Sequence, residues 1–105
     1  MTLFERTITA FKNNDFATFE EIHHEDFMFV REFSMSSREE HLDKIKEVLT
    51  GGTNTWHLRV ECIHEDDHVL VMRSTKVDRD GSEIITNNVS IKKGGLYWRT
   101  IINEV

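Results

Sequence analysis

Three arginines in strand-like segments are the side chains of this sequence best suited to hold a ligand. Arg31, Arg73 and Arg99 each lie in a stretch where apolar and polar residues alternate, which is typical of β-strands. A guanidinium group carries a planar fork of donors that binds carboxylate or phosphate groups in a bidentate manner. If the three side chains share the inner face of a sheet, they either clamp an anionic metabolite or pair with helix carboxylates such as Glu20 or Glu25.

Aromatic and amide side chains complete this predicted binding site. Asn87 is expected beside Arg73 and Tyr97 near Arg99, while Phe27 and Phe33 would add to an apolar wall for the carbon skeleton of the ligand. The predicted ligand-binding residues are Arg31, Arg73, Asn87, Tyr97, Arg99, Phe29 and Trp56.

The six histidines supply the candidates for proton transfer, since imidazole is the side chain that titrates near neutral pH. His23 and His41 lie in predicted helices and are the residues expected to reach the mouth of the pocket, where they would be catalytic. His64 and His68 flank an acidic turn and are interpreted as solvated. No metal and no cofactor is expected, because zinc sites need converging ligands at fixed geometry. Cys62 is interpreted as a small buried apolar residue.

Length and charge limit the classes of protein to consider. The chain has 105 residues, with 13 Lys and Arg against 19 Asp and Glu, a net charge of −6. We expect a single domain over residues 1–105. The acidic balance argues against nucleic-acid binding, and no apolar run approaches the roughly 20 residues of a membrane-spanning helix. A single cysteine and no visible signal peptide favour a cytoplasmic protein.

Helix signals gather in the first half of the chain. Thr2 with Glu5 and Ser37 with Glu40 have capping-box spacing, in which each side chain accepts from the other residue's backbone N–H. Asp15 follows an Asn-Asn break and can cap a further helix. Three helices are therefore expected, the last ending at Gly51-Gly52.

The second half is strand-rich, which favours an α+β fold over alternating α/β. A short strand is predicted over Phe27–Phe33, and four more near residues 55–63, 68–78, 83–92 and 96–104, joined by hairpin turns as an antiparallel meander. The turns pair Arg73 with Asn87, Val71 with Val89, and Val89 with Arg99.

This register divides the side chains of the sheet into two faces. The more apolar set is expected to pack against the helices; it includes Trp56, Leu58, Val60, Cys62, Val69, Val71, Arg73, Asn87, Val89, Ile91, Tyr97, Arg99 and Ile101. The opposite face would then carry an exposed apolar patch, through which a homodimer is expected. That patch consists of Leu70, Met72, Ile84, Trp98 and Ile102.

The order of these segments resembles the nuclear-transport-factor-2-like superfamily, and within it the SnoaL-like, ketosteroid-isomerase-like proteins. The resemblance rests on the Asn14-Asp15 helix break, the stretch His24 to Val30, the Asp80-Gly81 hairpin and the final strand Gly95-Leu96-Tyr97-Trp98-Arg99. It implies a cone-shaped, curved mixed sheet wrapped on three helices, with an internal pocket and often a dimer through the sheet.

The sequence departs from ketosteroid isomerase at the positions that matter for catalysis. Arg31 stands where that enzyme has its carboxylate base, Thr7 near its oxyanion-hole tyrosine, and Asn87 near its aspartic acid. Classical ketosteroid isomerase activity is therefore not expected.

Two functions stay open from the sequence. One is a small-molecule-binding protein with an arginine-lined apolar pocket for an anionic metabolite, as an isomerase, cyclase or dehydratase. The other is a noncatalytic dimeric association or binding module whose cone is filled by its own side chains. Fold alone does not decide between them.

Overall fold

The protein is described by a computed structural model that covers residues 1–52 and 54–105. Along the chain it forms α1 (Leu3–Lys12), α2 (Phe16–Ile22), β1 (His23–Val30), β2 (Met35–Ser37), α3 (Arg38–Thr50), the short 3₁₀ helix η1 (Trp56–Leu58), β3 (Val60–Glu65), β4 (Val69–Val77), β5 (Glu83–Lys93) and β6 (Leu96–Glu104). No helix in these ranges is long and apolar enough to cross a membrane.

The helices begin at the predicted capping residues. Both capping boxes form, with Thr2 at the start of α1 and Ser37 at the start of α3. The side chain of Asp15 accepts a hydrogen bond from the backbone N–H of Thr18 and so caps α2. Each cap satisfies N–H groups that would otherwise lack a partner in the first helical turn, which fixes where the helices start.

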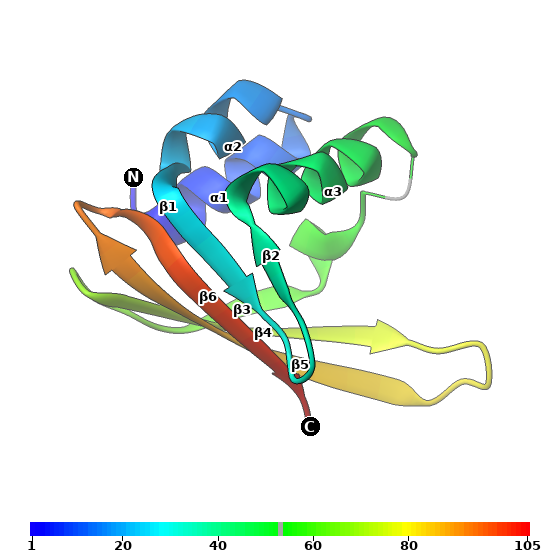
Figure 1. The fold of residues 1–105 in the computed structure, drawn as a ribbon. Helices are drawn as coiled ribbons and strands as arrows, with labels where there is room; N and C mark the ends of the chain where they lie inside the picture. Colours follow the sequence, from blue (N-terminus) through cyan, green and yellow to red (C-terminus); the bar gives the residue numbers. More distant parts are fainter. Residues whose placement is uncertain (53) are drawn as a thin grey trace.

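All strands join one mixed sheet in the order β2-β1-β6-β5-β4-β3. β1 runs parallel to β6, and the other neighbours are antiparallel. Figure 1 shows the helices gathered over one face and one end of the curved sheet, while the β4–β5 hairpin extends beyond them. The α+β fold with a curved mixed sheet on three helices is thus confirmed.

Three details differ from the prediction. The first strand begins earlier and ends earlier than expected, at His23 and Val30. The three-residue strand β2 was not predicted; it pairs antiparallel with the end of β1. Residues 56–58, expected as strand, form the 3₁₀ helix η1.

The predicted β4–β5 register is confirmed, with Arg73 opposite Asn87 and Val71 opposite Val89. Between β5 and β6 the register is shifted by two residues, so that Val89 faces Ile101 rather than Arg99. A bulge after Ile91 contributes to this shift. The even shift keeps Arg99 and Ile101 on the same face as Val89, whereas the bulge turns Tyr97 to the face opposite Arg99.

The assignment of those faces was wrong. Most of the sheet side chains that point toward the helices come from the set predicted to face outward: Leu70 is fully buried and Met72 is 3% exposed. Tyr97 and Trp56 are exceptions, since they lie inside as predicted. Val89, Ile91 and Ile101, expected inside, are exposed on the opposite face. The predicted apolar dimer patch of Leu70, Met72, Ile84, Trp98 and Ile102 therefore does not exist as drawn, since Leu70, Met72 and Ile102 belong to the interior or pack against it.

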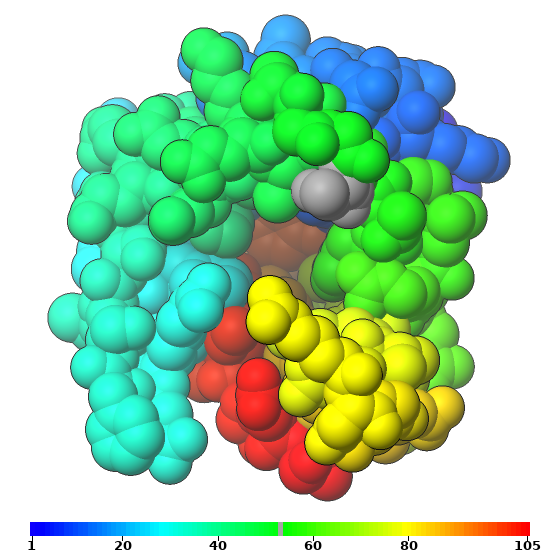
Figure 2. All heavy atoms as spheres, turned by 90° about the vertical axis from the view of Figure 1, so that its right-hand side faces the viewer, coloured from blue at the N-terminus to red at the C-terminus, as the bar shows by residue number. Residues whose placement is uncertain are grey.

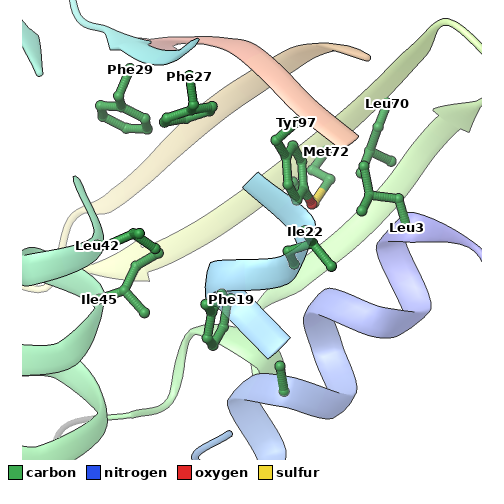
Figure 3. Close-up of a cluster of buried hydrophobic side chains, with 11 residues drawn as sticks. Leu3, Phe19, Ile22, Phe27, Phe29, Leu42, Ile45, Leu70, Met72 and Tyr97 are labelled. Atoms are coloured by element: carbon green, nitrogen blue, oxygen red, sulfur yellow. The ribbon is translucent and has the colours of Figure 1, made fainter. Parts of the chain in front are cut away.

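The core lies between the helices and the concave face of the sheet (Figure 3). Leu3 comes from α1, Phe19 and Ile22 from α2, and Phe27 and Phe29 from β1. Leu42 and Ile45 on α3, with Leu70, Met72, Ala10 and Tyr97, complete the buried cluster. The helices thus cover one part of the concave face and leave the rest open.

A largely buried ion pair holds α1 against the edge of this face. The carboxylate of Glu65 accepts hydrogen bonds from the backbone N–H groups of Leu3 and Phe4, at 3.0 and 3.3 Å. The ammonium of Lys92 lies 2.8 Å from the same carboxylate. A negative charge at a helix N-terminus is favourable, and here it also sets the position of α1 on the sheet.

Candidate ligand-binding cavity

The part of the concave face that the helices leave open forms a cavity of about 600 Å³. Figure 2 looks toward its opening, a hollow between the α3 region in green, β1 and β2 in cyan, the β4–β5 hairpin in yellow and β6 in red. This volume lies within the usual range for small-molecule sites.

The walls of the cavity differ in chemistry. The helix side and η1 contribute apolar and aromatic side chains, namely Phe11, Phe19, Ile45, Val48 and Trp56. The sheet side contributes mainly hydroxyl and amide groups, namely Ser74, Thr86, Asn88, Ser90 and Thr100. An apolar surface with a limited number of directed polar groups is typical of sites for organic molecules.

His23 presents one ring nitrogen to this cavity in a fixed role. Its Nδ1 lies 2.7 Å from the carbonyl oxygen of Phe19, so Nδ1 carries the proton and donates it. Burial lowers the pKa of His23 to about 4, which keeps the ring neutral at pH 7. The Nε2 atom is then an acceptor, held in position by the α2 carbonyl and by stacking on Tyr97 at 5.1 Å.

His41 lies beside His23, with ring centroids 5.3 Å apart. It stacks on Phe29 at 4.5 Å, and burial lowers its pKa to about 3, with further contributions from His23 and Arg31. Within residues 1–52 and 54–105 no side chain or carbonyl is hydrogen-bonded to its ring. A neutral His41 thus offers one donor and one acceptor to the cavity.

The hydroxyl of Tyr97 already forms a hydrogen bond within the protein. It lies 2.7 Å from the Thr7 hydroxyl, which itself donates to the carbonyl of Leu3 at 2.8 Å. Because Thr7 has a single proton, Tyr97 must be the donor in their contact. Burial raises the pKa of Tyr97 above its ordinary value. Tyr97 therefore orients the His23 ring and closes the cavity rather than donating to a ligand.

Hydrogen bonds also organise the sheet wall. The Ser90 hydroxyl donates to the amide oxygen of Asn88 at 3.2 Å and lies 2.8 Å from the Thr100 hydroxyl, which must be the donor. This arrangement occupies the amide oxygen of Asn88 and leaves its N–H groups for a ligand.

Positive charge lies at the edge of the cavity and negative charge does not. Arg31 and Lys44 are lining residues, and none of the lining residues in the described part of the chain is Asp or Glu. The guanidinium of Arg31 lies over the Phe29 ring, 5.2 Å from its centroid. Lys44 is exposed and pairs with Glu47 on the surface of α3, so Arg31 is the better candidate to bind an anion.

The structure brings together six of the nine residues predicted for the site. His23, His41, Phe29, Tyr97, Trp56 and Arg31 line the one cavity. The other three, Arg73, Asn87 and Arg99, lie on the convex face: Arg73 donates to Asn87 at 3.2 Å, and Arg99 donates to the carbonyl of Asp26. Those three cannot contribute to the cavity, because the alternation of side chains in β4 and β5 and the bulge near the start of β6 turn them away from it. The alternative interpretation, in which helix carboxylates pair with Arg31, Arg73 and Arg99, finds no such ion pair among the described residues.

Two other side chains lie elsewhere than expected. Phe33, assigned to the apolar wall, is 92% exposed at the β1–β2 turn. Cys62 is exposed rather than buried. No group of three or more potential metal ligands occurs in residues 1–52 and 54–105.

Sequence reasoning missed the polar wall and the contribution of α1. Thr86, Asn88 and Ser90 recur with the two-residue period of a strand, and this polar stripe between apolar neighbours was the available signal of a cavity-facing surface. Thr7 on α1 gave no such signal, because its role depends on a contact with Tyr97, distant in the sequence.

Compared by sequence, the chain matches no family model and no curated protein. Compared by structure, it is similar to several solved proteins over nearly its whole length. A protein from Sphaerobacter thermophilus has a TM-score of 0.68 and 13% identity, over 100% of this chain and 97% of that chain. A nuclear-transport-factor-2-like protein of unknown function from Cytophaga hutchinsonii has a TM-score of 0.63 and 10% identity, over 100% and 92%.

The chain has the nuclear-transport-factor-2-like fold. A candidate polyketide cyclase from Sinorhizobium meliloti shares it, with a TM-score of 0.65 and 16% identity over 93% of this chain and 90% of that chain. The fold resemblance expected from the sequence is confirmed. At these identities the nuclear-transport-factor-2-like fold is what is shared, and the chemistry has to be argued from the cavity.

Proposed function

We propose that this protein binds a small, largely apolar anionic metabolite in the cavity of its concave face. The observation that carries the proposal is the combination of apolar walls, a cationic edge at Arg31 and the absence of lining carboxylates in the described residues. An anion bound in this cavity would meet no repelling carboxylate, and a guanidinium is the side chain that recognises carboxylates best. A single arginine replaces the three that the sequence suggested.

The same cavity supports a proton transfer, for which His23 and His41 are the proposed groups. Both rings are neutral near pH 7 and keep a lone pair that accepts a proton, but their low pKa values make them weak bases, so the proton would return to the bound molecule rather than stay on the ring. Isomerisation, cyclisation and dehydration are the reaction classes that need such a step, and this part of the proposal rests on binding being established first.

The experiment is a thermal-unfolding screen with neutral and carboxylate-bearing aromatics. An acid at about 100 times its dissociation constant stabilises by about 2.7 kcal/mol, which raises the midpoint by roughly 10 °C for a domain of this size. We expect acids to stabilise the wild type, and the effect to be lost in Arg31→Ala.

Arg73→Ala is the matched control, since it removes the same charge from the opposite face of the sheet. It should keep the full shift. If Arg31→Ala retains the shift, or Arg73→Ala loses it, the cavity is not where the anion binds.

A second candidate function, an association module, is favoured by the convex face. A row of apolar residues crosses four paired strands there: Val71, Val89, Ile101 and Val30. Val89 and Ile101 are 37% and 46% exposed, and a contiguous apolar surface of this kind marks association. The proposed partner is a second copy of this chain, with the interface moved to the face opposite the one predicted from the sequence.

Light scattering after size exclusion tests this candidate. The wild type is expected to have twice the mass of the chain, and Val89→Glu the mass of one chain. Val77→Glu is the control, since Val77 is 68% exposed near the end of the β4–β5 hairpin. A wild-type protein with the mass of one chain at micromolar concentration would contradict the dimer.

The cytoplasmic location expected from the sequence stays a prediction.

A further inference from the structure

We propose that the cavity selects molecules with a hydroxyl group at one end and an anionic group at the other, separated by about one substituted aromatic ring. The hydroxyl would lie between His23 and His41, and the anionic group at Arg31. This inference rests on the proposed function and adds the chemical class and the orientation of the bound molecule.

The inner end of the cavity requires a group that donates a hydrogen bond. Since His23 uses its Nδ1 proton on the Phe19 carbonyl, only the lone pair of Nε2 is left for a ligand. A ketone, an ether or a carboxylate would place a second lone pair against it. A hydroxyl or an N–H group donates to it instead.

His41 further limits which group of a ligand fits at the inner end of the cavity. Its neutral ring supplies a donor and an acceptor within the same aromatic enclosure, and the two imidazole centroids are 5.3 Å apart. A hydroxyl oxygen between the rings can donate to His23 and accept from His41 at once, which uses both of its hydrogen-bonding capacities. The low pKa values of both histidines support this, because a neutral pair has no positive charge with which to attract a carboxylate to this end.

The outer end of the cavity, at Arg31, favours an anionic group instead of a hydrogen-bond donor. The guanidinium of Arg31 has no ion-pair partner in the described part of the chain, and it lies at the edge of the cavity. An anion placed there makes a charge-assisted hydrogen bond.

Phe29 fixes the distance between the two ends. The ring of His41 stacks on it at 4.5 Å, and the Arg31 guanidinium lies 5.2 Å from the same ring centroid. The His41 ring and the Arg31 guanidinium therefore lie no more than about 10 Å apart, which suits one aromatic ring with a short acidic side chain, and the aromatic body of the ligand would lie against Phe29 and Trp56.

Calorimetric titration with three matched acids tests the hydroxyl. 4-Hydroxycinnamate carries the donor, 4-methoxycinnamate only an acceptor, and cinnamate neither. We expect 4-hydroxycinnamate to bind about tenfold more tightly than either analogue, the ordinary value of one well-placed hydrogen bond. His41→Phe keeps the aromatic packing and the His23 acceptor, so it should reduce the preference for 4-hydroxycinnamate, whereas His23→Phe removes the acceptor and should bring the three acids to similar affinity.

The anionic end is tested with 4-hydroxycinnamyl alcohol, which lacks the charge. The wild type and Arg73→Gln should bind this alcohol about tenfold more weakly than the acid. Arg31→Gln should bind the alcohol and the acid with similar affinity.

The outcomes separate the inference from the function on which it rests. Equal affinity of the three acids, with Arg31→Gln still weakening all of them, overturns the hydroxyl and leaves the anion-binding cavity standing. Equal affinity of the acid and the alcohol overturns the anionic end. If none of the four compounds binds, this inference is wrong, and the thermal-unfolding panel then decides on the proposed function separately.

Discussion

The two faces of the sheet differ in a way that composition conceals. The convex face carries apolar residues, such as Val89, Ile91 and Ile101, and leaves them exposed. The concave face carries serine, threonine and asparagine, among them a fully buried Ser90, and it lines a cavity beneath the helices. A sheet can therefore expose apolar side chains on one face while polar side chains line a cavity on the other.

The physical reason lies in how much of the concave face the helices cover. Where α1, α2 and α3 pack against it, apolar side chains such as Leu70, Met72 and Phe29 exclude water. Beyond the helices the sheet faces a hollow, where hydroxyl and amide groups can bind water or a ligand. The convex face can be apolar without penalty if a second subunit covers it.

The largest expected difference in stability is between substitutions at two neighbouring residues that lie on opposite faces of the sheet. Leu70→Ala should lower the free energy of unfolding by about 2–5 kcal/mol, because Leu70 is fully buried in the core cluster. Val71→Ala, on the convex side of the same strand, should cost about 1 kcal/mol or less. Urea unfolding measures both. Similar losses would show that the two faces are not distinct.

Acid should reveal the neutral histidines of the concave face. The pKa values of His23 and His41, about 4 and about 3, lie below the ordinary value of 6.5. Above pH 6.5 neither the folded nor the unfolded chain carries these protons. As the pH falls toward 4, the unfolded chain takes up protons that the folded chain does not, so stability declines.

We expect a loss of a few kcal/mol between pH 6.5 and about 4, measured by denaturant titration at each pH. Carboxylates with lowered pKa values, such as Asp15 and Glu5, add their losses mainly at the acid end of this range and below it. His41→Phe should reduce the slope between pH 6.5 and 5. A stability that is constant over this interval would contradict the buried neutral pair.

The smallest expected effect separates polar groups on the two faces. Ser90→Ala removes the hydroxyl that joins Asn88 to Thr100 and should cost about 1–2 kcal/mol, because the buried Thr100 and the half-buried Asn88 each lose a bond. Asn87→Ala, on the convex face, removes only an exposed bond to Arg73 and should change stability by about 0.5 kcal/mol or less. Urea titrations of the two variants measure both losses of stability. Equal losses would show that polar groups on the two faces do not differ in their contribution to stability.

Local chemistry explains what the sequence could predict. Thr2, Asp15 and Ser37 cap helices through contacts within three residues, and the β4–β5 hairpin sets its own register. The bulge after Ile91 changed the β5–β6 pairing by one residue and the shorter turn after Lys93 by another, and no single residue there signals the bulge. His23 and His41 were recognised as candidates by residue type alone.

What the sequence could not predict depends on packing between distant segments. Arg73 and Arg99 were placed inside because their strands were oriented by counting apolar residues, and that count is misleading for a sheet with a cavity on one side and an exposed apolar row on the other. The pairing of Tyr97 with Thr7 likewise needs the three-dimensional arrangement of α1 over β6.

The most direct test of the central claim follows methyl resonances during a titration with 4-hydroxycinnamate. The methyl groups of Met72, Ile45 and Ile102 line the cavity, whereas those of Val89, Ile91 and Ile101 lie on the convex face. A molecule bound in the cavity should shift the first group through ring currents and leave the second unchanged. Shifts confined to the convex group would contradict the assignment of the cavity as the binding site.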